Sequence, residues 1–181
     1  MTKKELNKLR FPIGPFEKPE KYSKEIIEKY IQIISHFPAK LKTETSHLNE
    51  KQLNTPYRPQ GWTIKQVVHH CADSHINSFV RFKLALTEDN PTIKPYQEAK
   101  WAELPDSLNM AIEPSLMLLE GLHNRWTVLL NALTKKELER NFFHPEYERE
   151  ISLQEIMGFY SWHCEHHLAH ITQLKKLNNW K

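Results

Sequence analysis

Apolar side chains recur at helical spacing in four stretches of the chain, and most prolines lie between those stretches. A period of about 3.6 residues is typical of helices that bury one face, so each stretch predicts an amphipathic helix. The four helices are expected over residues 23–49, 63–87, 115–133 and 152–177. Pro38 falls inside the first of them and should kink the helix or restart it, because proline lacks a backbone donor.

Capping signals agree with three of these starting points. Ser23 is a good N-cap for the first helix. Thr63 with Gln66, and Ser152 with Glu155, have the spacing of capping boxes, in which two side chains satisfy free N–H groups of the first turn.

The remaining segments read as connections. They are an extended N-terminal arm over residues 1–21, a loop over 54–61, a long connection over 88–114, a short helix over 134–140, and a loop or short hairpin over 144–151. Four long helices with one long crossover predict an all-α four-helix bundle, formed as a single domain by residues 1–181.

Composition narrows the function classes. Only 4 of 181 residues are glycine, which argues against the phosphate-binding turns of dinucleotide folds and P-loops. The net charge of +3 comes without a basic run, so we expect neither nucleic acid nor a membrane as a partner. Two cysteines make no disulfide framework, and no apolar leader or 18-residue apolar segment is present, so a cytoplasmic location is expected.

Eleven histidines are the unusual feature, and seven of them lie in two of the predicted helices. In helix 152–177, His163, His166 and His170 fall within the apolar arc, whereas His167 lies at its margin. His166 and His170 are spaced i, i+4, so both imidazoles can converge on one metal ion. The alternative is that they are ordinary hydrogen-bonded core histidines.

Helix 63–87 offers a third ligand but leaves its identity open. His75 lies on the apolar stripe and His70 on a more polar face, and periodicity favours neither. Cys71 and Cys164 adjoin histidines, but their positions around the helices favour small buried hydrophobic residues over ligands.

Several segments together resemble the YfiT group of the DinB-like metalloprotein superfamily, and the resemblance covers essentially the whole chain. They are Phe11–Gly14 in the arm, Thr55–Arg58, Gly61–His75, Arg125-Trp126 and Trp162–Ile171. The resemblance implies a four-helix bundle with one divalent metal ion per subunit, zinc or sometimes nickel, held by His70, His166 and His170. It also implies a cytoplasmic homodimer and a metal-dependent hydrolase acting on a small molecule.

Two rivals to hydrolysis remain open. The glutamate of an HExxH motif is absent after His166, so Asp73 or His163 would have to replace it as the base, unless none is needed. Some relatives in the superfamily transfer a low-molecular-weight thiol such as bacillithiol, which needs no such base. Arg81 or Arg125 could then bind a carboxylate, although an ordinary ion pair is the simpler role for each. The other rival to hydrolysis is a metal-binding, stress-related bundle without turnover.

Overall fold

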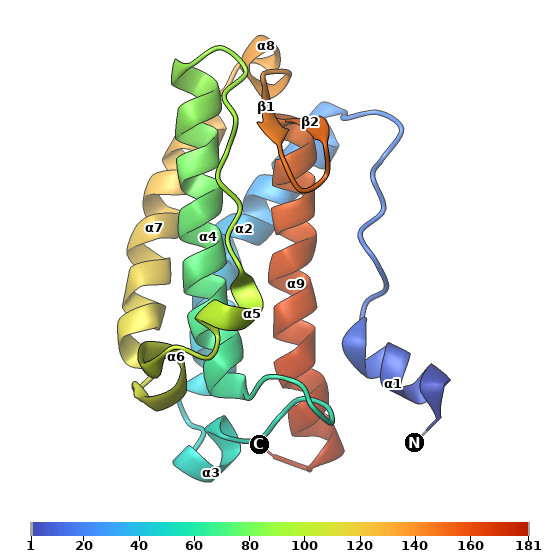
Figure 1. Cartoon of the computed structure of the whole chain (residues 1–181), viewed down its shortest axis with the longest axis vertical. Coiled ribbons are helices and arrows are strands. Elements are labelled where there is room, and N and C mark those ends of the chain that lie inside the picture. Colours follow the sequence, from blue (N-terminus) through green and yellow to red (C-terminus); the bar gives the residue numbers. More distant parts are fainter. Residues whose placement is uncertain (1, 181) are drawn as a thin grey trace.

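Four long helices run side by side in the computed structural model, which describes residues 2–180 (Figure 1). They are α2 (Lys24–Thr45), α4 (Ile64–Thr87), α7 (Glu113–Ala132) and α9 (Leu153–Leu177). Helix α2 packs against α7 and α9, and α4 packs against the same two helices. The predicted four-helix bundle is confirmed. No helix of residues 2–180 is both long and apolar enough to cross a membrane.

The core of the bundle draws large side chains from every long helix. The largest that are fully buried include Ile34, Phe37, Phe82, Leu119, Trp126 and Met157. Burial of such side chains is the main favourable contribution to folding, at about 1.5–3 kcal/mol each. The histidines described below lie in the same interior.

The crossover between α4 and α7 contains the short helices α5 (Glu98–Trp101) and α6 (Pro105–Asn109). Figure 1 shows it returning along α4, so that α4 and α7 run in the same direction. It is fastened near the start of α4, where the Gln66 side-chain amide donates to the Ala102 carbonyl at 2.8 Å. This contact brings α5 close to the N-terminal half of α4.

A hairpin closes the opposite end of the bundle. Strands β1 (Asn141–His144) and β2 (Arg149–Ser152) pair antiparallel and place Phe142 opposite Ile151, and α8 (Lys135–Leu138) precedes them. Of the two alternatives for this segment, the hairpin is the one observed. Both paired side chains are buried, which explains why so short a hairpin is held.

The N-terminal arm is extended only in part. Residues 11–21 contain no helix or strand, as expected for an arm, but the expectation for residues 3–10 is wrong, because α1 (Lys3–Arg10) forms there. Thr2 and Glu5 form a capping box that starts this helix. Gly14 has a φ of 80°, a conformation that L side chains rarely adopt, and it turns the arm along α9.

Helix α2 also departs from the prediction. It passes through Pro38 without restarting and ends at Thr45, and Asn49 caps the separate short helix α3 (Glu50–Leu53). Pro38 is buried, and the packing of α2 on α7 and α9 compensates for the backbone hydrogen bond that the proline removes.

Candidate metal centre

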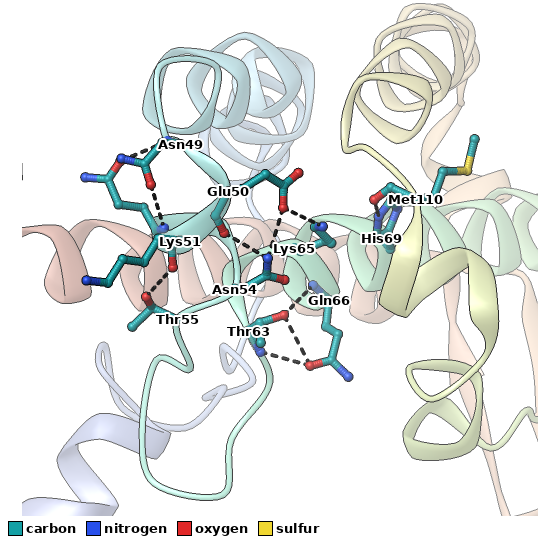
Figure 2. Close-up of polar contacts among 11 residues, drawn as sticks. Asn49, Glu50, Lys51, Asn54, Thr55, Thr63, Lys65, Gln66, His69 and Met110 are labelled. Carbon is teal, nitrogen blue, oxygen red and sulfur yellow. Dashed lines mark hydrogen bonds and ion pairs between the residues drawn. The ribbon is translucent and has the colours of Figure 1, made fainter.

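Polar contacts fix the first turn of α4 (Figure 2). The Thr63 hydroxyl accepts from the Gln66 backbone N–H at 3.1 Å, and Gln66 Oε1 accepts from the Thr63 N–H at 3.0 Å. The Lys65 ammonium donates to Glu50 Oε2 at 3.0 Å and so joins α4 to α3. These contacts set the direction in which α4 presents the His69–His70 pair.

The two adjacent histidines have different surroundings. His69 Nε2–H donates to the Met110 carbonyl at 3.3 Å, so its Nδ1 accepts from the Ser115 hydroxyl at 2.8 Å. Both nitrogens of His69 are therefore used by the start of α7 and the loop before it. His70 instead contacts the histidines of α9.

Within residues 2–180 the histidines form two groups able to hold a metal ion. In each group the ligand nitrogens lie within 4.8 Å of one another and all three residues are buried. The inter-helix group is His70, His163 and His167, and the α9 group is His166, His167 and His170. The structure thus groups His70 with His163 and His167. It does not group His70 with His166 and His170, the two ligands expected on α9. The set of His70, His166 and His170 remains a prediction.

The distance between His70 and His163 suits a metal ion. Their Nε2 atoms are 3.3 Å apart. Two nitrogens that each lie about 2.0–2.1 Å from a tetrahedral zinc ion are separated by about 3.3–3.4 Å. The facing imidazoles therefore have the spacing of two adjacent ligands.

A chain of imidazoles determines which nitrogen of His163 carries the proton and which carries the lone pair. The Ile34 carbonyl can only accept, so His123 Nδ1–H donates to it, at 2.6 Å. His123 Nε2 then accepts from His75 Nδ1–H at 2.7 Å. In turn, His75 Nε2 accepts from His163 Nδ1–H at 3.1 Å. The lone pair of His163 is left on Nε2, the atom that faces His70.

Pro38 explains why this carbonyl is available. In a regular helix the N–H of residue 38 would donate to the carbonyl of Ile34, and proline has no N–H. His123 of α7 takes its place as the donor. The proline that interrupts α2 therefore sets the orientation of an imidazole chain that ends at the candidate metal centre.

Burial keeps these histidines uncharged at neutral pH. Burial lowers the pKa of His70 and of His123 to about 4. It lowers the pKa of His163 and of His167 well below the usual 6.5. Neighbouring imidazoles add to the lowering of the pKa at His70, His163 and His167. Neutral imidazole is the form that binds metals. Nδ1 of His166, His167 and His170 is also buried without a hydrogen-bond partner. A cluster of buried neutral imidazoles with free nitrogens fits a divalent metal ion.

Two histidines of the α9 group contact residues of the arm, of the loop before α4 and of α9 itself. His170 Nε2–H donates to the Arg10 carbonyl at 3.2 Å, and Tyr57 stacks on its ring with centroids 3.9 Å apart. Trp162 stacks on His166 at 4.4 Å. His166 and His170 thus have packing partners that would hold them without a metal.

A carboxylate lies beside the inter-helix group. Glu98, on α5 of the crossover, places Oε2 4.0 Å from His70 Nε2. Burial and the nearby Glu146 raise the pKa of Glu98, and Arg81 opposes them. Glu98 also lines a cavity of about 390 Å³ that His166, His167 and His170 share. The α9 group, and the inter-helix group through His167, are therefore reached by a cavity that has a carboxylate at its edge.

The ligand set expected from the sequence leaves out three residues of this candidate centre. His163 and His167 have the same i, i+4 spacing as His166 and His170, so the spacing signal was present twice and did not discriminate between the pairs. Glu98 had no signal, because it lies 28 positions after His70 in the chain, in a connection without a helical period. The expectation for the cysteines is confirmed, since Cys71 and Cys164 are fully buried and belong to neither group.

Comparison with known proteins agrees with this architecture. The sequence profile of the DinB superfamily matches residues 36–171, which is most of the chain and includes α4, α7 and the histidines of α9. The chain belongs to the DinB superfamily.

Two related sequences and one solved structure match a larger part of the chain than the profile does. A protein of Bacillus cereus named "Putative metal-dependent hydrolase" is 53% identical over 175 residues, which is 97% of this chain and 100% of that protein. YfiT of Bacillus subtilis, also named as such a hydrolase, is 49% identical over 95% of this chain and 97% of its own. A solved YfiT structure superposes with a TM-score of 0.94 at 48% identity, covering 96% of this chain and 99% of that chain, and is described as a probable metal-dependent hydrolase with an unusual four-helix bundle topology.

Proposed function

We propose that this protein is a metal-dependent hydrolase of small molecules and that His70, His163 and His167 hold its metal ion. The geometry of the inter-helix group supports this ligand set, because it joins two helices and contains a lone pair whose direction is set by the imidazole chain. The set of His70, His166 and His170 is the competing proposal. His167 is common to both groups of the structure, so His163 is the ligand that distinguishes the inter-helix group from the α9 group.

The position of Glu98 is the single observation that favours hydrolysis. Three imidazoles leave open coordination positions, and a divalent ion bound there would polarise a substrate carbonyl and lower the pKa of water towards 7. Glu98 is placed to accept the proton of the attacking water and pass it to the leaving group, which is the task of a general base. This carboxylate supplies what the missing HExxH glutamate would have supplied.

Zinc is the proposed metal, with nickel as the alternative. Neutral imidazole nitrogens suit both ions, and the 3.3 Å separation of His70 and His163 Nε2 matches a tetrahedral zinc site. We further propose a cytoplasmic homodimer. The outer face of α7 supports a self-association surface, because it exposes Met117, Leu118 and Val128.

The experiment measures hydrolysis of a simple aryl ester by zinc-loaded protein and by its Glu98→Gln variant. Loss of the base should lower kcat by about 10²–10⁴-fold while zinc still binds at one ion per chain. Glu103→Gln is the matched control, since Glu103 is an exposed carboxylate of the same crossover outside the cavity. Equal kcat for wild type and Glu98→Gln would contradict the role of Glu98.

A parallel assay distinguishes hydrolysis from thiol transfer. The metal-loaded protein is offered an electrophile together with a low-molecular-weight thiol. Turnover that requires the thiol, without ester hydrolysis, would replace the proposed function by thiol transfer. Turnover in neither assay, with zinc bound, would favour a metal-binding bundle without catalysis.

A further inference from the structure

Arg81 of α4 is a buried cation without a partner. Only 9% of the residue is exposed, and among residues 2–180 its guanidinium has neither a hydrogen bond nor an ion pair. Two other arginines show the usual arrangement, since Arg140 donates to the Glu88 carbonyl at 2.6 Å and Arg149 pairs with Glu155 at 2.6 Å. An unpaired buried charge is unfavourable, so its presence calls for a ligand.

Arg81 lines two cavities that lead towards the metal centre. The outer cavity has a volume of about 460 Å³ and the inner one about 90 Å³. Both are lined by Arg81, His144, Tyr147 and Phe159, and the inner cavity is also lined by His163. The residues shared by the two cavities therefore form one wall, which runs from Arg149 and Ile151 of the hairpin to His163 of the inter-helix group.

The helix places Arg81 in line with His70. The two residues are eleven positions apart on α4, which is close to three whole turns, so they lie on the same face about 16 Å apart along the axis. Side chains lean towards the N-terminus of their helix, and arginine reaches further in that direction than the shorter imidazole of His70, which brings the guanidinium nearer to the centre. The guanidinium is thus roughly 10 Å from the reacting position.

A second polar group faces the same space. His144 is buried, lines both cavities, and its Nδ1 has no partner. Two carboxylates, Glu98 and Glu146, line the inner cavity, but neither lies within ion-pair distance of Arg81. Among these groups, Arg81 remains the one fixed positive charge without a partner.

We propose that Arg81 binds a carboxylate of the substrate, so that the hydrolase acts on compounds with a carboxylate about 10 Å from the bond that is cleaved. A guanidinium presents a planar fork that matches the two oxygens of one carboxylate. A dianionic phosphate fits less well, because Arg81 is the one unpaired guanidinium among the described residues that line these cavities, and Glu98 and Glu146 would repel the second charge. The proposal rests on the proposed function for the position of the reacting bond.

The test compares two aryl esters on the zinc-loaded full-length protein, a neutral p-nitrophenyl alkanoate and a p-nitrophenyl half-ester of a dicarboxylic acid of matched length. Wild type should prefer the charged ester in kcat/KM, mainly through KM. In Arg81→Met this preference should fall about tenfold to hundredfold, the effect of losing a charge-assisted hydrogen bond. Arg125→Met is the control, because Arg125 is exposed and lines neither cavity, and it should keep the preference.

A binding measurement separates this proposal from the proposed function. Calorimetric titration of the same proteins with adipate, which is too short to reach from Arg81 to the metal centre and so reports on the carboxylate site alone, should give a Kd that rises at least tenfold in Arg81→Met, whether or not either ester is hydrolysed. If neither ester reacts but adipate binding depends on Arg81, the carboxylate site stands and hydrolysis fails. If Arg81→Met keeps the ester preference and the adipate affinity of wild type, the proposal is overturned.

Two further outcomes are decisive. Inorganic phosphate that binds wild type more tightly than adipate, and loses that affinity in Arg81→Met, would contradict the carboxylate class. Arg81→Lys covers the case in which Arg81→Met does not fold, since it keeps the charge but removes the fork. We expect it to lose at least several-fold in adipate affinity, and an unchanged affinity would overturn the bidentate recognition.

Discussion

At the scale of single residues, the imidazole chain gives adjacent histidines distinct roles. A neutral imidazole donates from one nitrogen and accepts at the other, so each link fixes the next one. His123 and His75 use both nitrogens in the chain, and His163 is left with an available lone pair on Nε2. Hydrogen bonds of this kind orient metal ligands and raise their basicity.

The first prediction separates the two ligand sets. His163→Gln should reduce zinc binding by at least tenfold in affinity, because it removes a ligand of the inter-helix group. His170→Gln should leave stoichiometric binding intact, since His170 is held by Arg10 and Tyr57 instead. Zinc stoichiometry and affinity are measured by competition with a chelator, with circular dichroism as the check on folding. The reverse pattern would support the set of His70, His166 and His170.

At the scale of elements, α2 and α9 approach closely where α9 has a glycine. A Cβ added at Gly158 would lie 2.9 Å from Tyr30 Cε2 and 3.1 Å from its Cζ. Glycine in a helix interior normally lowers stability by about 0.5–1 kcal/mol relative to alanine. The close approach of the two helices is the physical reason to retain it.

The second prediction uses a pair of helical glycines. Gly121→Ala on α7 should raise the free energy of unfolding by about 0.5–1 kcal/mol, because nothing lies within 4 Å of the added Cβ. Gly158→Ala should instead lower it by about 1 kcal/mol or more, because the Tyr30 ring must move. Urea unfolding of both variants measures the difference. Equal stabilisation by the two substitutions would show that α2 and α9 pack less closely.

At the scale of the whole molecule, the arm, the hairpin and α9 meet at one carboxylate. Glu155 of α9 accepts from Lys18 of the arm and from Arg149 of β2, each at 2.6 Å. Further along α9, Trp162 Nε1–H donates to the Gly14 carbonyl at 3.1 Å. These contacts hold the arm against the helix that carries most of the histidines.

The third prediction concerns acid stability. Burial alone would raise the pKa of Glu155, but Arg149 and Lys18 outweigh it and hold the pKa below its usual 4.5. A lowered pKa in the folded state stabilises the protein above pH 4.5, and this contribution is lost as the pH falls through the folded pKa. The stability advantage of wild type over Glu155→Gln should therefore shrink between about pH 6 and about pH 4.

The control for acid stability is Glu28→Gln, which removes an exposed carboxylate 3.7 Å from Lys24. Exposed pairs contribute little, so this variant should follow wild type across the pH range. Urea midpoints at each pH measure the effect. An advantage of wild type over Glu155→Gln that stays constant down to pH 4 would contradict the prediction.

The sequence alone determined the four helices, most of their boundaries and the concentration of histidines in two of them. It could do so because helical period and capping act between neighbours in the chain. It also placed His70 and His75 on one helix and four histidines on another, but it left open which of His70 and His75 would join them. Only the tertiary structure decided which α9 histidines face His70, because the i, i+4 spacing occurs twice there. It alone brought the Ile34 carbonyl freed by Pro38 to His123, placed Glu98 beside His70, and left Arg81 unpaired against a cavity. These contacts join residues far apart in the chain, and their geometry depends on how the helices pack.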